Sequence, residues 1–542
     1  MIFSILASPV ATSLLRLGLS AHRLFSIGCY TRLVKVLVAN RGEIAVRIMR
    51  ACREMGLPTV AVWSDCDRLA PHVRYADEAV GLEADAPGES YLRIEKIIDA
   101  AARTGADAVH PGYGFLAENA AFARAVQEAG LTFIGPPADV IDLMGGKTAA
   151  RAAAARAGVP IVPGSGGPLP DDATPEQLQA AGEAVGYPVF VKAVAGGGGK
   201  GMRLVREPEL LLRAIEGARS EAASAFGDGS VYLERFIEHG RHIEVQLLAD
   251  AHGTVVPFVE RECSIQRRHQ KVIEESPSPV VTPPTRRALA EAAASLAREV
   301  GYTNAGTIEM LYDEDGSFYF LEMNTRLQVE HPVTEMVTGF DLVRWQLRIA
   351  QGERLDIDPA KALTPEGHAI ECRVYAEDPD AGFMPCPGLL TAHRPPAGPG
   401  IRVDAGVATG FEVPVHYDSM VAKVIAHASD RPTAIARMDR ALSEYEIGGV
   451  PTTIPLFRWL LAHDDVVAAR FDTTFLDRVL ANRNGEPFLE PPDDGEETAI
   501  LAAALSVALG GATDASDGGA SSSSVGPGAS RWKQTARVEG LR

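Results

Sequence analysis

Residues 306–331 constrain the fold of this chain more than any other stretch. Two runs of mainly apolar and aromatic residues, Thr307–Tyr312 and Phe318–Met323, flank the turn sequence Asp313–Gly316. Strand-forming runs on either side of a short turn that contains glycine predict a β-hairpin. Because successive side chains of a strand point to opposite faces, the register of the pairing decides which residues meet.

The register of this hairpin determines whether it carries a metal site. If Tyr312 pairs with Tyr319, Glu309 lies directly opposite Glu322, and the two carboxylates repel each other. A bound divalent cation removes that repulsion, and the hard oxygen ligands favour Mg²⁺ or Mn²⁺. The sequence therefore predicts a metal site at this pair, and the alternative is a solvated acidic hairpin without a metal.

The residues that follow Glu322 favour the metal site. Polar and apolar side chains alternate here, so the polar ones share a face if the chain stays extended. These polar residues are Asn324, Arg326, Gln328 and Glu330. Amides, a guanidinium and a free carboxylate beside two opposed carboxylates are more typical of a binding groove than of a solvated strand.

Charge and composition exclude several classes of protein. The 542 residues have a formal net charge of −19, whereas a general nucleic-acid-binding surface needs excess positive charge. No apolar run reaches the roughly 18–20 residues of a membrane span. The six cysteines form no CxxC pair, which argues against a zinc ribbon and a disulfide framework. The sequence predicts a soluble intracellular protein of about three or four domains.

The N-terminal part of the body predicts a βαβ unit. Val34–Ala39 and Thr59–Trp63 are apolar strands, and Gly42–Met55 between them has the apolar spacing of a helix. The first turn lacks the G-x-G-x-x-G pattern, so we expect no dinucleotide site there.

Two further segments are candidates for anion binding. The strand Pro188–Lys192 leads into the glycine-rich loop Ala195–Met202, which is no Walker A loop because no Ser or Thr follows Lys200. Its backbone N–H groups can approach phosphates, although a flexible hinge has the same composition. Glu260–Lys271 contains three Arg, one Lys and one His, which predicts a phosphate or carboxylate site, or else a basic surface loop.

The two ends differ from the body in composition. Residues 1–33 contain no Asp or Glu and are similar to an organelle transit peptide; the alternative is an upstream extension or a misassigned start. Near the other end, Thr498–Leu509 predicts an apolar helix, residues 510–530 a disordered linker and residues 531–542 a basic tail.

From about Val34 to Leu480 the chain resembles the biotin carboxylase family of ATP-grasp enzymes. Several long motifs in one order carry this resemblance: Val38–Ala45, His110–Asn119, Lys192 with the glycine loop, Arg267–Lys271, Glu322–His331, Glu371–Arg373 and Tyr417–Met420.

The resemblance implies an α/β architecture built on the ATP-grasp fold. The expected parts are an extension (1–33), an N-terminal α/β domain (34–147), a lid with a mobile glycine loop (148–235), the central ATP-grasp domain (236–365), the C-terminal biotin carboxylase domain (366–485), and a helix, linker and tail (486–542).

The family implies ATP, Mg²⁺ (or Mn²⁺) and bicarbonate as ligands, and biotin as the substrate. The positions that match phosphate contacts are Lys147, Lys192, Gly198 and Gly199. Those that match the adenine segment or lie near the nucleotide are Glu234, Arg235, Ile237, His242, Gln266 and His269. Those that match the metal ligands are Glu309, Glu322 and Asn324, in agreement with the hairpin.

The same resemblance implies the chemistry. Bicarbonate is held at the positions that match Lys271, Arg326, Gln328 and Val329. Glu330 matches the base that deprotonates bicarbonate, and the carbonate attacks the γ-phosphate of ATP to give carboxyphosphate and ADP. Carboxyphosphate breaks down to CO₂ and phosphate, which takes the biotin proton, while Arg373 stabilises the biotin enolate.

The resemblance also bears on partners. After Lys423 the only lysine is Lys533, outside a Met-Lys-Met-like turn, so we expect biotin on a separate carrier protein and a separate carboxyltransferase. Acetyl-CoA is the expected acceptor; propionyl-CoA, another acyl-CoA and pyruvate stay open. The family implies a homodimer. We expect the protein in the cytoplasm, or in an organelle matrix if residues 1–33 are a transit peptide. The rivals are another ATP-grasp carboxylate ligase and a catalytically silent nucleotide-binding protein.

Overall fold

A parallel sheet of five strands forms the N-terminal part of the chain, in the order β3-β2-β1-β4-β5. The predicted βαβ unit is confirmed, because β1 (Val36–Val38) and β2 (Thr59–Trp63) pair in parallel on either side of α3 (Gly42–Glu54). The other main elements are α4 (Pro71–Tyr75), β3 (Glu78–Gly81), α5 (Ile94–Thr104), β4 (Ala108–His110), α6 (Ala120–Glu128), β5 (Thr132–Phe133) and α7 (Ala138–Gly145).

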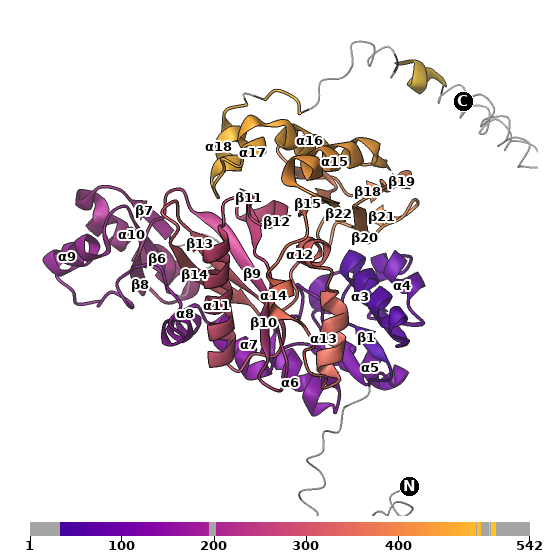
Figure 1. Cartoon of the computed structure of the whole chain (residues 1–542), viewed down its shortest axis with the longest axis horizontal. Helices are drawn as coiled ribbons and strands as arrows, with labels where there is room; N and C mark the ends of the chain where they lie inside the picture. The colour runs from indigo at the N-terminus through magenta and orange to yellow at the C-terminus, as the bar shows by residue number, and fades with distance from the viewer. Residues whose placement is uncertain (1–32, 195–201, 484, 489–497, 499, 506–542) are drawn as a thin grey trace, which may run out of the picture. The chain divides into compact units, whose positions relative to one another are not determined.

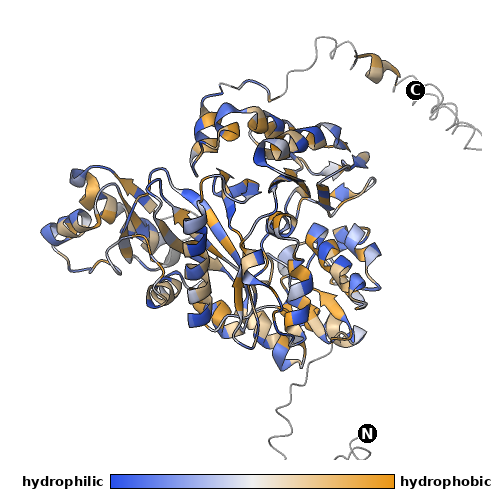
Figure 2. Ribbon diagram, viewed as in Figure 1, coloured by the Kyte–Doolittle hydropathy of each residue, from blue (hydrophilic) through white to orange (hydrophobic). Residues whose placement is uncertain are grey.

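The central strands of this sheet are buried on both faces, as is usual for parallel sheets. In Figure 2 the helices around the sheet carry both hydrophilic and hydrophobic residues. These helices therefore cover the apolar strands with one side and face water with the other.

The structure is a computed structural model that describes residues 33–194, 202–483, 485–488, 498 and 500–505. The chain divides into two units, Met1–Phe488 and Leu489–Arg542. In the second unit, residues 498 and 500–505 are helical. The extension, the linker and the basic tail predicted from the sequence lie outside the described residues, apart from residue 33. None of the helices in the described ranges is both long and apolar enough to cross a membrane.

A small antiparallel sheet, β7-β6-β8, carries the predicted lid. Its strands are β6 (Val189–Ala193), β7 (Met202–Val205) and β8 (Val231–Arg235). The helices packed on it are α9 (Pro175–Val185) and α10 (Leu211–Phe226), whereas α8 (Lys147–Arg156) packs against β14 (Phe318–Asn324) of the large sheet. The glycine-rich loop connects β6 to β7, and residues 195–201, with Gly198 and Gly199, lie outside the described residues.

A sheet of nine strands dominates the rest of the first unit (Figure 1). Eight strands follow the order β14-β13-β9-β11-β12-β15-β22-β20, and β10 pairs with β9. The strands are β9 (Arg241–Ala249), β10 (Val255–Pro257), β11 (Arg261–Arg267), β12 (Gln270–Ser276), β13 (Asn304–Tyr312), β14 (Phe318–Asn324), β15 (His368–Tyr375), β20 (Ile401–Ala405) and β22 (Met420–Ala428).

The helices of this part are α11 (Pro283–Glu299), α12 (His331–Thr338), α13 (Leu342–Ala350), α14 (Pro359–Ala362), α15 (Arg431–Glu444), α16 (Ile454–Ala462), α17 (Asp464–Val467) and α18 (Phe475–Ala481). Short strands complete the C-terminal part: β16 (Glu377–Asp378), β17 (Met384–Pro385), β18 (Gly388–Leu389), β19 (Ala392–Arg394), β21 (Glu412–Val413) and β23 (Glu446–Gly448).

The hairpin predicted around Asp313–Gly316 is confirmed, but its register differs from the prediction. Tyr312 pairs with Phe318 and not with Tyr319. An irregularity then shifts the register between Met310 and Glu309, so that one residue of β14 has no partner. Such a β-bulge adds one residue to one strand. Glu309 therefore lies opposite Glu322 as expected, but because of the bulge and not because Tyr312 pairs with Tyr319.

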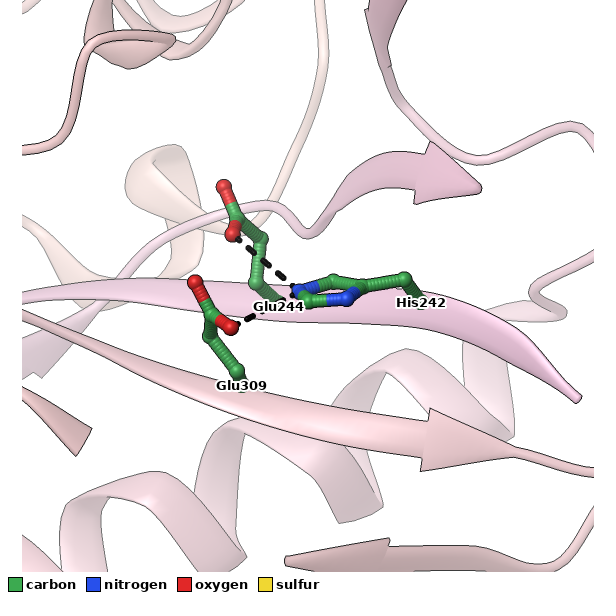
Figure 3. A group of neighbouring side chains, drawn as sticks. All are labelled: His242, Glu244 and Glu309. Carbon is green, nitrogen blue, oxygen red and sulfur yellow. Dashed lines mark ion pairs between the residues drawn. The ribbon is translucent and has the colours of Figure 1, made fainter. Parts of the chain in front are cut away.

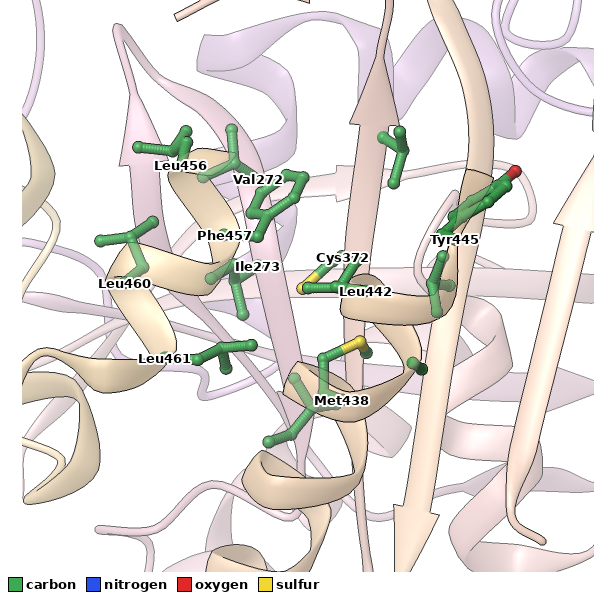
Figure 4. Packing of buried hydrophobic residues seen from close by; sticks show 14 of the residues in the cluster. Val272, Ile273, Cys372, Met438, Leu442, Tyr445, Leu456, Phe457, Leu460 and Leu461 are labelled. Atoms are coloured by element: carbon green, nitrogen blue, oxygen red, sulfur yellow. The ribbon is translucent and has the colours of Figure 1, made fainter. Parts of the chain in front are cut away.

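A hydrophobic cluster packs behind the sheet at β12 and β15. Figure 4 shows Ile273 and Cys372 from these strands facing α15 and α16, and Met438 and Phe457 of these helices belong to the same buried cluster. Because side chains alternate along a strand, the neighbouring Glu274 and Arg373 point to the opposite face. The core thus fixes the strands that present polar groups on the other side.

Candidate active site

A cavity of about 680 Å³ opens where the hairpin, the nine-stranded sheet and loops of the N-terminal part meet. Ten residues singled out from the sequence line it: His242, His269, Lys271, Glu309, Glu322, Asn324, Arg326, Gln328, Val329 and Arg373. Loop residues of the N-terminal part, including Arg41 and Tyr113, and Tyr417 from the C-terminal part form the facing wall.

Lys271 lies at the centre of the charged groups. Its Nζ donates hydrogen bonds to Glu244 Oε2 (2.6 Å), Glu309 Oε1 (2.7 Å) and Glu330 Oε1 (2.6 Å). Burial alone lowers the pKa of this ammonium group, but the three carboxylates outweigh it and raise the pKa well above its ordinary value. Lys271 is therefore a fixed positive charge inside the cavity.

His242, Glu244 and Glu309 form a tight group beside Lys271 (Figure 3). His242 Nε2 lies 3.0 Å from Glu309 Oε2 and 3.8 Å from Glu244 Oε2. Gln266 Nε2 donates to His242 Nδ1 (3.1 Å), which directs the other ring nitrogen at the carboxylates. Burial alone would raise the pKa of Glu309, but Lys271 and His242 have the larger effect and lower the pKa below its ordinary value. This carboxyl group is therefore ionised.

Glu309, Glu322 and Asn324 offer the oxygen donors of the predicted metal site. Asn324 Nδ2 donates to Glu309 Oε1 (2.9 Å), while the carboxylate of Glu322 accepts no hydrogen bond from the described residues. Partial burial and the charge of Glu309 raise the pKa of Glu322. Two opposed carboxylates, one of them unpartnered, and an amide oxygen form a donor set that fits Mg²⁺ or Mn²⁺.

The polar residues after Glu322 come together, but not on an extended strand. β14 ends at Asn324, and residues 325–330 form bends and turns, because the chain must reach the start of α12. Arg326 nevertheless donates to Asn324 Oδ1 (2.8 Å) and to Gln328 Oε1 (3.2 Å), and Gln328 Nε2 donates to Glu309 Oε1 (3.0 Å). The alternation of polar and apolar residues therefore predicted correctly that these polar side chains lie together, but the extended backbone that it implied is wrong.

Glu330 is fully buried at the N-cap of α12, between two cations. Lys271 holds Oε1, and Arg373 Nη2 donates to Oε2 (2.9 Å). Burial raises the pKa of Glu330, yet Lys271, Arg373 and Arg261 together lower it well below its ordinary value. Arg373 also donates from Nε to Glu274 Oε1 (2.6 Å), so its guanidinium is fixed between two carboxylates.

Several residues expected near ATP lie outside the cavity lining, on the lid and next to it, whereas His242 and His269 line the cavity. Lys192 and Arg151 both form ion pairs with Glu234, the latter at 2.6 Å. Lys147 begins α8, Arg235 ends β8, and Ile237 follows in a buried position. The structure thus brings Lys192 and Glu234 into contact, together with Arg151 of α8.

Sequence reasoning missed several buried charged residues that hold the site. Glu244 accepts from Lys271 and from Arg261 Nε (2.5 Å), and Arg261 has no exposed side-chain surface. Glu274 and Lys423 are buried on β12 and β22. Each is a charged residue in or beside an apolar strand, and that signal was available in the sequence.

Family models match three consecutive parts of the chain. The biotin carboxylase N-terminal domain matches residues 32–141, and the biotin carboxylase C-terminal domain matches residues 371–478. Between them, the ATP-binding domain of the carbamoyl-phosphate synthase L chain matches residues 146–358.

Relatives of known function agree with these matches. Biotin carboxylase 1 of Bacillus subtilis is 52% identical over 444 residues, which cover 82% of this chain and 98% of that protein. The chain belongs to the biotin carboxylase family. One of the pyruvate carboxylase subunits of Methanothermobacter thermautotrophicus is 51% identical over 443 residues, or 82% of this chain and 89% of the relative.

A solved structure shows the same fold. The biotin carboxylase domain of 2-oxoglutarate carboxylase from Hydrogenobacter thermophilus, a dimer in complex with MgADP, ADP and bicarbonate, has a TM-score of 0.75 and 48% identity, covering 82% of this chain and 97% of that one. The predicted ATP-grasp fold is thereby confirmed. This biotin carboxylase is an ATP-dependent ligase, and its relatives serve carboxylases with different acceptors.

Proposed function

We propose that this biotin carboxylase carboxylates biotin on a separate carrier protein, using ATP, Mg²⁺ (or Mn²⁺) and bicarbonate. The strongest support is that Lys271, Arg326 and Arg373 line one cavity, with Glu330 buried behind it and hydrogen-bonded to Lys271 and Arg373. Two guanidinium groups and an ammonium group attract a small anion, and a buried carboxylate beside them can accept its proton.

Glu330 becomes a stronger base once the anion is present. In the structure Lys271 and Arg373 hold its carboxylate, and their charges lower its pKa. A bound bicarbonate takes a share of these cations and adds a negative charge nearby, and both effects raise the pKa of Glu330. The base is thus available mainly when its substrate occupies the site.

The proposed reaction transfers the γ-phosphoryl group to bicarbonate. Glu330 takes the bicarbonate proton, a carbonate oxygen attacks the γ-phosphorus, and the bond to the leaving ADP oxygen breaks. The C–O bond of the carboxyphosphate then breaks to give CO₂ and phosphate, and the phosphate removes the proton from biotin N1. Arg373 stabilises the resulting enolate, which captures CO₂.

The charged groups divide between substrate and nucleotide. A cation bound at Glu309, Glu322 and Asn324 would neutralise charge on the transferring phosphoryl group. We assign phosphate contacts to Lys147, Lys192, Gly198 and Gly199. The adenine and nucleotide contacts are Glu234, Arg235, Ile237, His242, Gln266 and His269. Bicarbonate also meets Gln328 and Val329.

We also propose the first half-reaction of an acetyl-CoA or other acyl-CoA carboxylase as the physiological role. Biotin carboxyl carrier protein and carboxyltransferase subunits are then the partners of a homodimer. The alternative is a keto acid as the acceptor of the carboxyl group, because some relatives are named for pyruvate and 2-oxoglutarate carboxylases.

ADP release by the purified chain tests the half-reaction. The assay contains MgATP, with and without bicarbonate, and with and without free biotin. We expect turnover that requires bicarbonate and rises with biotin. Turnover that ignores bicarbonate would overturn the proposal; a missing biotin response calls for the same assay with biotinylated carrier protein. Adding carboxyltransferase subunits with acetyl-CoA or pyruvate then identifies the acceptor.

A further inference from the structure

Lys423 is a fully buried lysine in the middle of the apolar strand β22. Its side chain has no exposed surface, and neither have its neighbours Ala422 and Val424. Burying an ammonium group is costly unless the charge is paired and hydrogen-bonded. The hydrogen-bond and ion-pair partners of Lys423 therefore indicate what the residue does.

The partners of Lys423 come from two other parts of the molecule. Nζ donates a hydrogen bond to the carbonyl oxygen of Val329 (2.8 Å), in the loop before α12. It also lies 3.1 Å from Oε1 of Glu43, a buried residue of α3. Lys423 thus connects the N-terminal part, the active-site loop and the C-terminal part at one point.

The bond to Val329 fixes a peptide next to the base. A trans peptide is planar, so holding its C=O sets the direction of the following N–H and the start of the next residue. Lys423 holds the peptide between Val329 and Glu330 in this way. The preceding carbonyl, that of Gln328, is 2.8 Å from His331 Nδ1, which orients the N–H of Val329. Both peptides that flank Val329 are therefore held from outside the cavity.

We propose that Lys423 is a positioning residue for bicarbonate, which acts through the Val329 carbonyl to place the Val329–Glu330 backbone. This inference rests on the proposed function, in which Val329 and Glu330 meet the substrate. Lys423 itself does not line the cavity. Its loss should weaken the use of bicarbonate and leave the nucleotide site intact.

A purely structural role makes a different prediction. If Lys423 only neutralised Glu43, removing both charges together would restore normal behaviour. The variants Lys423→Met and Lys423→Met/Glu43→Gln separate the two roles, because neither contains a donor for the Val329 carbonyl, while the double variant also removes the carboxylate of Glu43 that is paired with Lys423. Lys423→Arg retains a donor, and Lys361→Met on the surface of α14 is the matched control.

The measurements are KM for bicarbonate and KM for MgATP in the ADP-release assay, and the rise in Tm that bicarbonate causes in the presence of MgADP. We expect Lys423→Met and the double variant to raise KM for bicarbonate by about tenfold or more, the loss expected for one hydrogen bond to a charged group. KM for MgATP should stay unchanged, the bicarbonate-induced Tm rise should shrink, and Lys423→Arg should recover part of the loss.

The double variant distinguishes the two roles of Lys423 even if the single variant Lys423→Met does not fold. A double variant with the KM for bicarbonate of the unsubstituted chain would overturn the inference. So would a Lys361→Met control that shows the same defect. If the unsubstituted chain itself shows no dependence on bicarbonate, the proposed function fails instead, so the two failures are distinguishable.

Discussion

At the scale of single residues, the site depends on buried charges that neutralise one another. Glu330 has no exposed surface and meets one cation at each carboxylate oxygen, Lys271 at 2.6 Å and Arg373 at 2.9 Å. Breaking a buried ion pair leaves an uncompensated charge, so such groups are hard to remove without a defect. Replacing Glu330 by a neutral side chain of the same shape removes the base without removing side-chain volume.

Replacing the base tests its assigned role. We expect Glu330→Gln to lower bicarbonate-dependent ADP release by about a hundredfold or more, the usual contribution of a general base. The affinity for MgATP, measured by titration calorimetry, should stay the same because Glu330 lies away from the lid residues. Glu314→Gln, in the hairpin turn, is the control and should behave as the unsubstituted chain. Retained turnover, or a loss of ATP affinity, would contradict the assignment.

The residues that the sequence predicted and those it missed differ in physical kind. Glu309 and Glu322 were recognisable because two like charges on neighbouring strands demand an explanation. Glu274 and Lys423 stand out only as charges in or beside apolar strands, and their roles were not recognisable because their partners Arg373 and Val329 are 94 or more residues away in the chain. Local patterns predict local pairs, whereas only the tertiary fold shows which distant charge compensates a buried one.

At the scale of elements, the β-bulge in β14 is what places Glu322 in the cavity. Without the extra residue, the pairing of Tyr312 with Phe318 would turn Glu322 toward the core face, where Met310 and Phe320 are buried. The register expected from the sequence pairs Tyr312 with Tyr319, and that register places Glu309 opposite Glu322 without a bulge. The metal pair was thus predicted correctly from an incorrect register, since periodicity alone does not show where a bulge lies.

The turn between β11 and β12 carries backbone strain at the cavity. Arg267 pairs with Gln270, and the two residues between them, Arg268 and His269, have φ values of 50° and 67°. Two-residue hairpin turns with positive φ prefer Asn and Gly, because other side chains adopt this conformation at a cost. The turn keeps a histidine that lines the cavity instead.

Substitutions at His269 measure that strain. His269→Gly and His269→Ala both remove the imidazole, but only glycine relieves the left-handed backbone. We expect the glycine variant to have a free energy of unfolding about 1 kcal/mol above that of the alanine variant, by denaturant titration. Both should weaken nucleotide binding to the same extent. Equal stabilities would show that the turn is not strained.

At the scale of the whole molecule, one sheet joins segments that the sequence assigns to separate domains. β12 pairs with β15 from Ile273 to Ser276, so the strands of the expected central and C-terminal domains are continuous. The domain limit near residue 365 stays a prediction. Sequence patterns predicted the strands of the hairpin in this sheet but neither β12 nor β15, and their pairing over such a distance leaves no local signal.

Burial of ionisable groups across the molecule affects its stability in two opposite directions. Burial raises the pKa of Glu43 and of Glu274 to about 7, so these groups take up protons in the folded state and favour it as the pH falls. Burial lowers the pKa of His72 to about 4 and that of His110 to about 3, so below their ordinary value of 6.5 only the unfolded state takes up these protons. The two sets oppose each other between about pH 4.5 and 6.5.

A single histidine substitution isolates one of these contributions. His72 Nε2 lies 3.3 Å from the carbonyl oxygen of Val62, and His72→Gln retains a donor for this contact. As the pH falls below the unfolded-state pKa of His72, this residue lowers the free energy of unfolding of the unsubstituted chain by about 1.4 kcal/mol per pH unit. Glutamine does not titrate and has no such effect. We therefore expect the stability deficit of the variant to shrink by about 2 kcal/mol from about pH 7 to about pH 5, measured by denaturant titration. The deficit should stay constant above about pH 7, where neither state binds this proton. A deficit that is equal at both pH values would mean that the folded protein protonates His72 as readily as the unfolded chain does.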